Sequence, residues 1–307
     1  MKEKLVAIVG PTAVGKTKVS IQLAKAVGGE IINGDSMQVY KGMDIGTAKI
    51  TEEEMEGVPH HLFDFKHPTE SYSASEFQTL ARPLVTEINQ RNQVPIVVGG
   101  TGLYIKSLTH GYDFSAADAD SLFREQMEAF ARENGAEKLY ERLREVDPQS
   151  AEKIHPHNVR RVIRALEIHH TTGIPASRQR KRKQQSPYIL ATVGLTMDRE
   201  VLYRRINERV DQMIENGLIE EVRRLYENGV RDCPSVQAIG YKEIYSYFQG
   251  ECTKEEAIRQ LKKNSRRYAK KQYTWFRRQM EVRWFDMTAG DIDKKISAIM
   301  QFVAGKL

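Results

Sequence analysis

The residues with the clearest chemical potential form a loop close to the N-terminus. They match the pattern G-x-x-x-x-G-K-[ST] and are Gly10, Pro11, Thr12, Ala13, Val14, Gly15, Lys16 and Thr17. The two glycines let the backbone curl until successive N–H groups point at phosphate oxygens, while Lys16 adds a full positive charge. The Thr17 hydroxyl can bind a magnesium ion. The pattern therefore predicts a site for a phosphate-rich ligand.

Two further polar side chains follow apolar runs of the strand type. Asp35 follows residues 30–34, and Thr101 stands between glycines after residues 94–98. Ligands of parallel α/β sheets bind outside the carboxyl ends of the strands, where both side chains are expected. Asp35 is a candidate general base or magnesium partner, and the alternative is a solvated aspartate in a turn. For Thr101 the alternative is a plain loop hydroxyl.

Strand-like and helix-like segments alternate around these residues. Helices are predicted at 16–27 and 74–91, and buried strands at 4–9, 30–35, 94–98 and 188–195. Short apolar runs separated by helices are typical of a parallel sheet that is covered on both faces. We therefore predict the α/β class, with a P-loop NTPase-like parallel sheet as the core.

The end of the run at 94–98 lacks a carboxylate. It passes directly into Gly99 and Gly100, whereas a phosphate-loop ATPase usually has an aspartate there to hold magnesium. The guanine-reading motif Asn-Lys-x-Asp is also absent from the sequence. Both observations disfavour an ordinary nucleotide hydrolase.

Strand signals vanish between about residues 115 and 185, where helical patterns dominate. Because another strand-like run follows, we interpret this region as a helical insertion. We expect a core of residues 1–114 and 186–307, and an insertion domain of residues 115–185. The tail is expected to be helical from 200 to 279, with a last short strand at 282–286.

Two segments concentrate positive charge. Residues 178–183 carry five cations and residues 262–278 carry eight, with no acidic residue in either. On a helix over 261–279 one arc is basic and consists of Lys262, Lys263, Arg266, Arg267, Lys270 and Lys271. The opposite arc is apolar and consists of Leu261, Tyr268, Trp275 and Phe276. We expect the apolar arc to pack on the domain and the basic arc to contact nucleic-acid phosphates, the alternative being a solvated face.

A shorter basic face is expected on a helix over 158–172. Arg160, Arg161 and Arg164 lie together there, but Glu167 on the same helix favours an ordinary solvated face.

The composition describes a soluble globular protein. The 307 residues are 29% charged and 40% hydrophobic with a net charge of +6, and no apolar run of about 18 residues could cross a membrane. Cys233 and Cys252 are too few for a disulfide framework, and the N-terminus passes directly into the first strand. We therefore expect a cytoplasmic protein without a membrane partner.

Several motifs together resemble the tRNA dimethylallyltransferase family, also called isopentenyl-tRNA transferases. The matching stretches run in family order and lie at 10–17, 35–40, 42–49, 59–62, 99–104, 164–167, 237–243 and 273–277. The zinc-finger extension of the eukaryotic relatives is missing, so the chain is similar to the bacterial type. The resemblance covers nearly the whole chain.

The resemblance implies a donor and an acceptor. The phosphate loop would hold the pyrophosphate of dimethylallyl diphosphate, which accounts for the missing strand-end carboxylate. The acceptor would be the exocyclic amine of the adenosine just 3′ of the anticodon, position 37, in tRNAs that read codons beginning with U. The partner would therefore be the anticodon stem-loop of tRNA, gripped by the insertion and the basic helix, with the target base flipped out. A monomer is expected.

The resemblance also implies roles for individual residues. Asp35 matches the general base, and Thr101 matches a residue that contacts tRNA beside the reacting centre. Lys16, together with magnesium at Thr17, would stabilise the departing pyrophosphate, and Arg205 matches a pyrophosphate-binding arginine with Arg204 as the near alternative. The residues implied to contact tRNA are Asp35, Ser36, Met37, Gln38, Thr101 and Arg124, to which the basic faces add Arg160, Arg161, Lys263, Arg267 and Lys271.

Two other functions remain alternatives at this point. One is a P-loop kinase that phosphorylates a small molecule with ATP. The other is a non-enzymatic RNA-binding protein that responds to a nucleotide.

Overall fold

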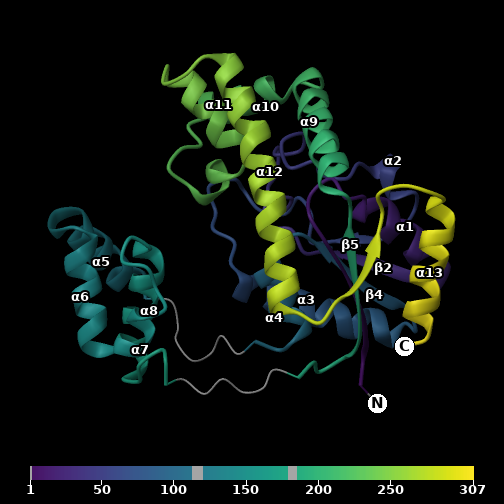
Figure 1. Ribbon diagram of the computed structural model, residues 1–307, viewed down its shortest axis with the longest axis horizontal. Coiled ribbons are helices and arrows are strands. Elements are labelled where there is room, and N and C mark those ends of the chain that lie inside the picture. Colours follow the sequence, from purple (N-terminus) through teal and green to yellow (C-terminus); the bar gives the residue numbers. More distant parts are fainter. Residues whose placement is uncertain (1, 113–119, 179–184) are drawn as a thin grey trace. The chain divides into compact units, whose positions relative to one another are not determined.

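The computed structural model describes residues 2–112, 120–178 and 185–307 (Figure 1). The chain divides into two compact units. The first comprises Met1–Gly111 and Ser186–Leu307, and the second comprises Tyr112–Gln185, where the sequence predicts an insertion at 115–185. Most of the predicted basic run at 178–183 lies outside the described residues.

A six-stranded parallel sheet forms the centre of the first unit. In spatial order its strands are β3 (His60–His61), β2 (Gly29–Asn33), β4 (Val94–Gly99), β1 (Lys4–Val9), β5 (Ile189–Thr196) and β6 (Arg283–Asp286). The interior strands β1 and β4 are mostly apolar, as expected for a sheet that helices cover on both faces. The predicted P-loop NTPase-like α/β fold is therefore confirmed. The sequence analysis missed β3, which is only two histidines long.

Two pairs of helices pack with this sheet. On one face α1 (Lys16–Val27) and α13 (Ile292–Ala304) contact each other and share a core with alternate strand residues such as Val6 and Val193. The other pair, α3 (Ala74–Gln90) and α4 (Gly102–Thr109), also pack together, and α4 contacts β1 and β4. The short helix α2 (Glu52–Met55) begins at a Thr51 capping box.

A second hydrophobic core of the first unit joins the tail helices to the segment that follows β2. The helices are α9 (Arg199–Glu215), α10 (Leu218–Glu227), the 3₁₀ helix η1 (Pro234–Gln237), α11 (Tyr241–Phe248) and α12 (Lys254–Gln279). Val39, Tyr40 and Met43 from the early segment are buried among them. This packing fixes the loop after β2 against helices that come almost two hundred residues later.

The second unit is a small helical bundle. It contains α5 (Ser121–Asn134), α6 (Ala136–Val146), α7 (Pro148–Ala151) and α8 (Val159–Thr172). Leu139, Leu143, Val162 and Leu166 form its core. Among the described residues of the whole chain, no helix is long and apolar enough to cross a bilayer.

Helix α12 begins at Lys254, earlier than the predicted residue 261, because Thr253 and Glu256 form a capping box there. Leu261 and Phe276 are buried as predicted, but Tyr268 and Trp275 are only half buried. The predicted apolar arc is therefore narrower than expected. The exposed basic arc is narrower as well, because Lys262 pairs with Asp211 and Arg266 donates to the Asn207 side chain.

The two aromatic residues of α12 should differ in their contribution to stability. Phe276 is 0% exposed, so Phe276→Ala should lower the free energy of unfolding by about 3–5 kcal/mol. Trp275→Ala should cost less because part of its ring remains in water. Chemical denaturation of both variants measures the difference, and an equal loss would contradict the observed burial.

Candidate active site

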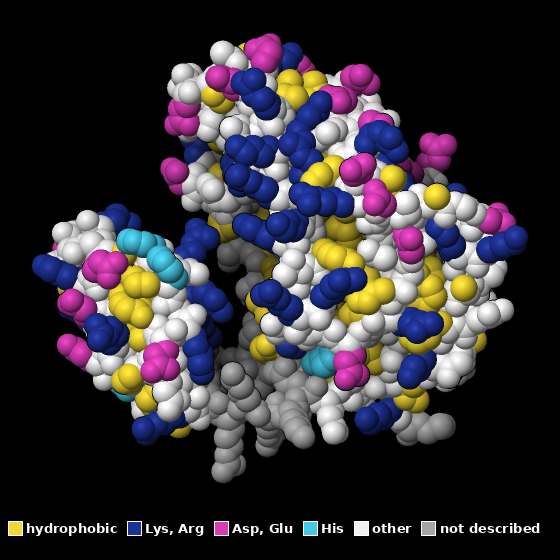
Figure 2. All heavy atoms as spheres, viewed as in Figure 1, with side chains coloured by type: hydrophobic (Ala, Val, Ile, Leu, Met, Phe, Trp, Pro, Cys, Tyr) yellow, Lys and Arg dark blue, Asp and Glu magenta, His cyan; other side chains and the backbone are white. Residues whose placement is uncertain are grey.

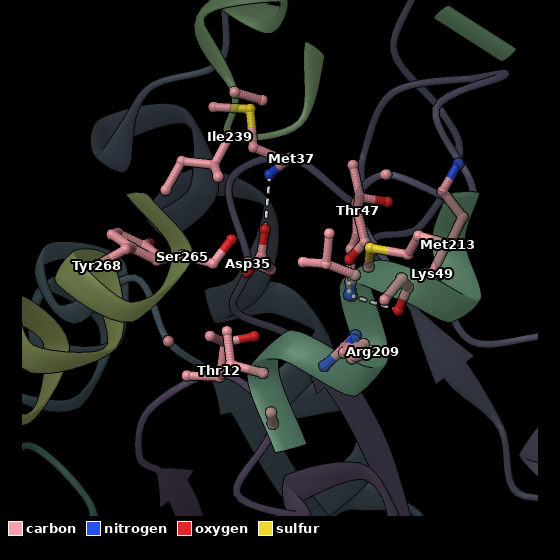
Figure 3. Close-up of a pocket in the computed structure, with 18 of the residues that line it drawn as sticks. Thr12, Asp35, Met37, Thr47, Lys49, Arg209, Met213, Ile239, Ser265 and Tyr268 are labelled. Atoms are coloured by element: carbon pink, nitrogen blue, oxygen red, sulfur yellow. Dashed lines mark hydrogen bonds between the residues drawn. The ribbon is translucent and has the colours of Figure 1, made fainter. Parts of the chain in front are cut away.

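The phosphate loop opens into a single cavity of about 1260 Å³ in the first unit. Its walls come from the phosphate loop, the segment after β2, the end of β4, and helices α9 and α12 (Figure 3). The predicted site residues among its lining are Thr12, Ala13, Gly15, Lys16, Thr17, Asp35, Ser36, Met37, Gln38, Arg205, Arg267 and Lys271. Gly10, Pro11 and Val14 are buried in the loop itself. Segments that are far apart in the sequence thus meet at one place.

The phosphate loop has the conformation that its glycines predict. Gly15 ends the loop at a φ of 100°, a left-handed conformation that favours glycine, and α1 begins at the next residue. Lys16 turns back over the loop, where its Nζ donates to the carbonyl oxygens of Gly10 at 3.1 Å and Pro11 at 2.8 Å. Burial lowers the pKa of Lys16 to about 8, although the negative charge of Asp35 acts in the opposite direction.

Asp35 is held in place from both sides. Its Oδ1 accepts the backbone N–H of Met37 at 2.8 Å, and its own N–H donates to the Asn33 side chain at 2.9 Å. Asn33 is itself buried at the end of β2 and donates to the carbonyl of Leu62. Asp35 does lie in a local turn, as the alternative interpretation expected. It nevertheless faces the cavity (Figure 3).

Thr101 lies beside this turn, at the start of α4. Its hydroxyl accepts the N–H of Ser36 at 3.2 Å, and Tyr268 lies close enough for Thr101 to influence the pKa of its phenol. Burial raises the pKa of Tyr268 to about 12, so this phenol stays protonated at neutral pH. The sequence analysis placed Tyr268 on the packing face of α12, which was wrong: it lines the cavity.

Arg209 is the main cavity residue that the sequence analysis missed. It is half buried, and its charge influences the pKa of Lys16. Burial lowers the pKa of Arg209, and the negative charges of Asp35 and Glu54 oppose that effect. The sequence did contain a signal for Arg209. It follows Arg205 by one helical turn on α9, so the two side chains lie on the same face of the helix. Both Arg204 and Arg205 are exposed, but only Arg205 lines the cavity.

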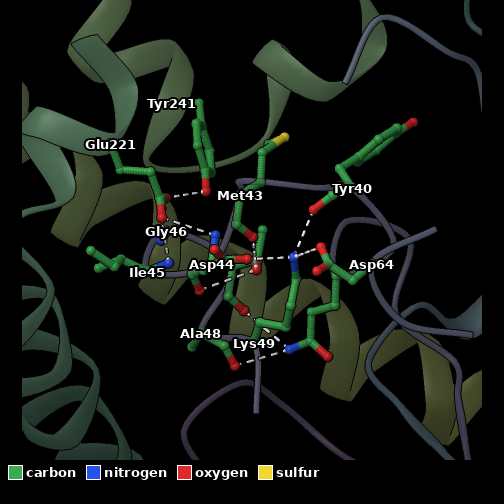
Figure 4. Close-up of polar contacts among 12 residues, drawn as sticks. Tyr40, Met43, Asp44, Ile45, Gly46, Ala48, Lys49, Asp64, Glu221 and Tyr241 are labelled. Atoms are coloured by element: carbon green, nitrogen blue, oxygen red, sulfur yellow. Dashed lines mark hydrogen bonds and ion pairs between the residues drawn. The ribbon is translucent and has the colours of Figure 1, made fainter. Parts of the chain in front are cut away.

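A rigid loop over residues 42–49 forms another wall of the cavity (Figure 4). The carboxylate of Glu221, on α10, accepts three backbone N–H groups of this loop, from Asp44 at 2.9 Å, Ile45 at 2.8 Å and Gly46 at 3.0 Å. It also accepts the Tyr241 hydroxyl at 2.6 Å. Four hydrogen bonds stabilise this carboxylate although it is only 6% exposed.

Gln38 ties the same loop to the Asp35 turn. Its side-chain nitrogen donates to the carbonyls of Thr47 and Ala48, each at 3.1 Å. The resemblance assigns Gln38 to tRNA binding, but the nitrogen of its side-chain amide already donates hydrogen bonds within the protein. Its contact with tRNA stays a prediction.

Three of the exposed cations of α12, spaced four residues apart, form a row. Lys263, Arg267 and Lys271 are all exposed, and Figure 2 shows Lys and Arg side chains gathered over the region of this helix. Within this row Arg267 and Lys271 also line the cavity. A polyanion bound along α12 would therefore reach the cavity entrance.

The second unit places its predicted contacts differently. Arg160 and Arg161 are exposed on α8, but Arg124 forms an ion pair with Glu167, with 2.8 Å between Nε and Oε1. Burial would raise the pKa of Glu167, yet hydrogen bonds from Arg124 and Arg164 lower it below its usual value. Glu167 is 0% exposed, so its expected place on a solvated face was wrong. In the structure the Arg124 side chain forms its ion pair within the bundle. Its contact with tRNA stays a prediction.

Comparison with known proteins identifies the family. The family model described as IPP transferase matches residues 38–279. The chain belongs to the IPP transferase family. The predicted family resemblance is thus confirmed, and the two alternative functions lose their support.

Relatives of this IPP transferase extend the match over the whole chain. The tRNA dimethylallyltransferases of Geobacillus kaustophilus and Anoxybacillus flavithermus are 61% and 60% identical, and each alignment covers 100% of this chain and 98% of the relative. The phosphate loop and Asp35 precede the family-model match but lie within these alignments. The enzyme class is therefore tRNA dimethylallyltransferase.

Solved structures agree with this assignment. The full-length tRNA isopentenylpyrophosphate transferase from Bacillus halodurans is 59% identical with a TM-score of 0.77, over 99% of this chain and 97% of that one. A eukaryotic dimethylallyltransferase acting on tRNA is 30% identical with a TM-score of 0.86, over 99% of this chain and 80% of that one.

The pKa of Lys16 predicts a pH dependence of pyrophosphate binding. Below about pH 8 Lys16 is protonated and attracts the anion, and above it the charge is lost. As the pH rises, the affinity of the wild type for pyrophosphate should therefore fall relative to the affinity of Lys16→Arg, because arginine stays charged. At high pH the ratio of the two affinities should change by about tenfold per pH unit. Calorimetric titrations between about pH 7 and pH 10 measure this ratio. The ionisation of pyrophosphate affects both proteins equally and therefore cancels from it. A constant ratio would mean that the Lys16 charge does not contribute.

Proposed function

We propose that this IPP transferase transfers the dimethylallyl group of dimethylallyl diphosphate to the N6 amine of adenosine 37, just 3′ of the anticodon, in tRNAs that read codons beginning with U. The products are N6-isopentenyladenosine and diphosphate. The observation that carries the proposal is one cavity in which Lys16, Arg205 and Arg209 lie with the carboxylate of Asp35. Such a cavity can bind an anionic leaving group and accept a proton within the same space.

The phosphate loop is the proposed seat of the diphosphate. Its N–H groups, the N-terminus of α1 and the Lys16 cation all favour negative charge there. Arg205 and Arg209 extend this positive region across the cavity from α9. Charge that develops on the diphosphate as its bond to carbon breaks would therefore be stabilised by groups already in position.

Magnesium fits the oxygen ligands around the phosphate loop. The Thr17 hydroxyl is exposed at the start of α1 and, like the Asp35 carboxylate, belongs to the cavity lining. Among the described residues no cluster of three or more His, Cys, Asp or Glu side chains could hold a metal ion. Magnesium at phosphate sites commonly uses one or two protein oxygens together with the phosphates. Thr17 would hold the ion, which when bound would neutralise charge on the diphosphate.

Asp35 is the proposed general base. In the reaction the N6 nitrogen forms a bond to C1 of the dimethylallyl group, and the bond between C1 and the diphosphate oxygen breaks. The bonding electrons leave with the diphosphate, and the N6 proton passes to the Asp35 carboxylate. The hydrogen bond from Met37 to Oδ1 and the anchor at Asn33 orient this carboxylate. Thr101 and the protonated Tyr268 lie beside the Asp35 turn and are proposed to border the adenine.

The proposed RNA partner is the tRNA anticodon stem-loop. Lys263, Arg267 and Lys271 would contact its phosphates along α12, and Arg160 and Arg161 would add contacts from the second unit. Adenosine 37 must leave its stack to enter the cavity. We propose that the active species is a monomer.

Removal of the proposed base should abolish most turnover. Asp35→Asn keeps the shape of the side chain but accepts no proton at neutral pH, so turnover should fall by about two orders of magnitude or more, as should that of Asp35→Ala. Mass analysis of nucleosides from tRNA incubated with enzyme and dimethylallyl diphosphate measures the product. Binding of the stem-loop should persist in both variants. Single-turnover rates near wild type would exclude Asp35 as the base.

Neutralising the exposed row on α12 should weaken the binding of RNA and leave the binding of diphosphate unchanged. The triple variant of Lys263, Arg267 and Lys271 to glutamine should bind the stem-loop less tightly, and the salt slope of log affinity should fall by about 0.7–0.9 for each lost phosphate contact. Fluorescence anisotropy at several salt concentrations measures this slope. A matched control replaces Lys294, Lys295 and Lys306, of which Lys294 and Lys306 are exposed and Lys295 is half buried, at α13 and its C-terminal end. Equal slopes in the two triple variants would move the RNA-binding surface elsewhere.

A further inference from the structure

Gln272, on α12, connects two loops of the cavity through one side chain. Its Oε1 accepts the backbone N–H of Thr12, in the phosphate loop, at 2.9 Å. Its Nε2 donates to the carbonyl oxygen of Gly100, just before Thr101, at 3.1 Å. Only this orientation of the amide pairs an acceptor with the N–H and a donor with the carbonyl. The side chain is 5% exposed, so both bonds are shielded from water.

The surroundings of Gln272 are shaped to admit the amide. A Cβ atom at Gly100 would collide with the Gln272 side-chain nitrogen, so a larger residue at Gly100 would displace it. One helical turn earlier, Tyr268 lies near the side chains of Thr101 and Gln272, whose polar interactions with the phenol lower its pKa against the larger effect of burial. The amide therefore belongs to a connected set of contacts that reaches from the phosphate loop to Thr101.

The bond to Thr12 bears on phosphate binding. A phosphate loop binds its ligand through the directions of its backbone N–H groups, and Gln272 fixes the direction of one of them from outside the loop. The preceding residue, Lys271, is exposed and belongs to the proposed RNA-binding row. The same turn of α12 therefore faces the RNA on one side and holds the phosphate loop on the other.

We infer that Gln272 is a positioning residue that holds the phosphate loop in its diphosphate-binding conformation. The inference rests on the proposed function, because it takes diphosphate to be the ligand of this loop. Gln272 acts through Thr12 and Gly100. Its loss should therefore affect the donor and leave the attraction of α12 for RNA unchanged.

The test compares Gln272→Met, which keeps the length of the side chain and removes both hydrogen bonds, with wild type. Calorimetry with inorganic pyrophosphate should give about tenfold weaker binding, the effect of losing one or two buried hydrogen bonds that hold the loop. The KM for dimethylallyl diphosphate should rise by a similar factor. Stem-loop affinity and the KM for the stem-loop should stay within about twofold of wild type.

Gln78→Met is the matched control. Gln78 is also a buried glutamine, on α3, and its Nε2 donates to the carbonyl of Ser107 away from the cavity. Both variants should lose thermal stability, but only the Gln272 variant should lose pyrophosphate affinity. If Gln272→Met does not fold, Gln272→Asn keeps a neutral amide but is one methylene shorter, cannot reach both Thr12 and Gly100, and should weaken pyrophosphate binding in the same direction.

The possible failures are distinguishable. If wild type binds pyrophosphate and a folded Gln272 variant binds it equally well, the positioning role is excluded while the proposed function stands. An equal loss of pyrophosphate and stem-loop affinity would point to general distortion of α12 and would also exclude it. If wild type itself does not bind pyrophosphate, the proposed function fails, and this inference fails with it.

Discussion

The parallel register of the three central strands is the constraint on which the site depends. Val9 of β1 lies beside Gly99 of β4, and Val98 of β4 lies beside Asn33 of β2, so the three strands end at one edge of the sheet. The phosphate loop, the Thr101 loop and the Asp35 turn follow those ends directly. A shift of one strand by a single residue would turn its apolar side chains from one face to the other. Because different helices pack on the two faces, such a shift would break the side-chain packing on both, so this packing fixes the register and, with it, the positions of the cavity residues.

The charges at this edge depend on one another. Lys16 and Arg209 are partly removed from water, which disfavours their charged forms, and the carboxylate of Asp35 acts against this effect on both. In the free protein the aspartate therefore helps to keep the cations protonated, and a bound diphosphate would take over that role. In the proposed reaction, the leaving group and the proposed proton acceptor, Asp35, would occupy the same electrostatic environment. Such an arrangement lowers the barrier by placement of charge before the reaction begins.

The parts of the fold and site that could be predicted were local in the sequence. The phosphate loop, the apolar strands and the Asp35 turn each consist of neighbouring residues whose types are sufficient to identify them. Glu221 and Gln272 could not be found in this way, because their partners lie more than a hundred residues away and a buried polar side chain looks like a surface residue in the sequence. Glu167 was misjudged because it too is a buried acidic side chain that looks like a surface residue in the sequence, although its partners lie nearer, 43 residues away at Arg124 and 3 at Arg164. Tyr268 was misplaced because an aromatic residue at helical spacing indicates packing far more often than it indicates a cavity wall.

The position of β5 has a consequence for the order in which the chain is completed during synthesis. This strand lies between β1 and β6, and Leu5 pairs with Leu190 across nearly two-thirds of the chain. The contacts of the second unit are local by comparison, and its helices leave the ribosome before β5 does. Local helical contacts form faster than distant strand pairs. During synthesis the inserted bundle can therefore fold while β1 still lacks its neighbour β5. The parallel sheet is then the last part of the protein to be completed.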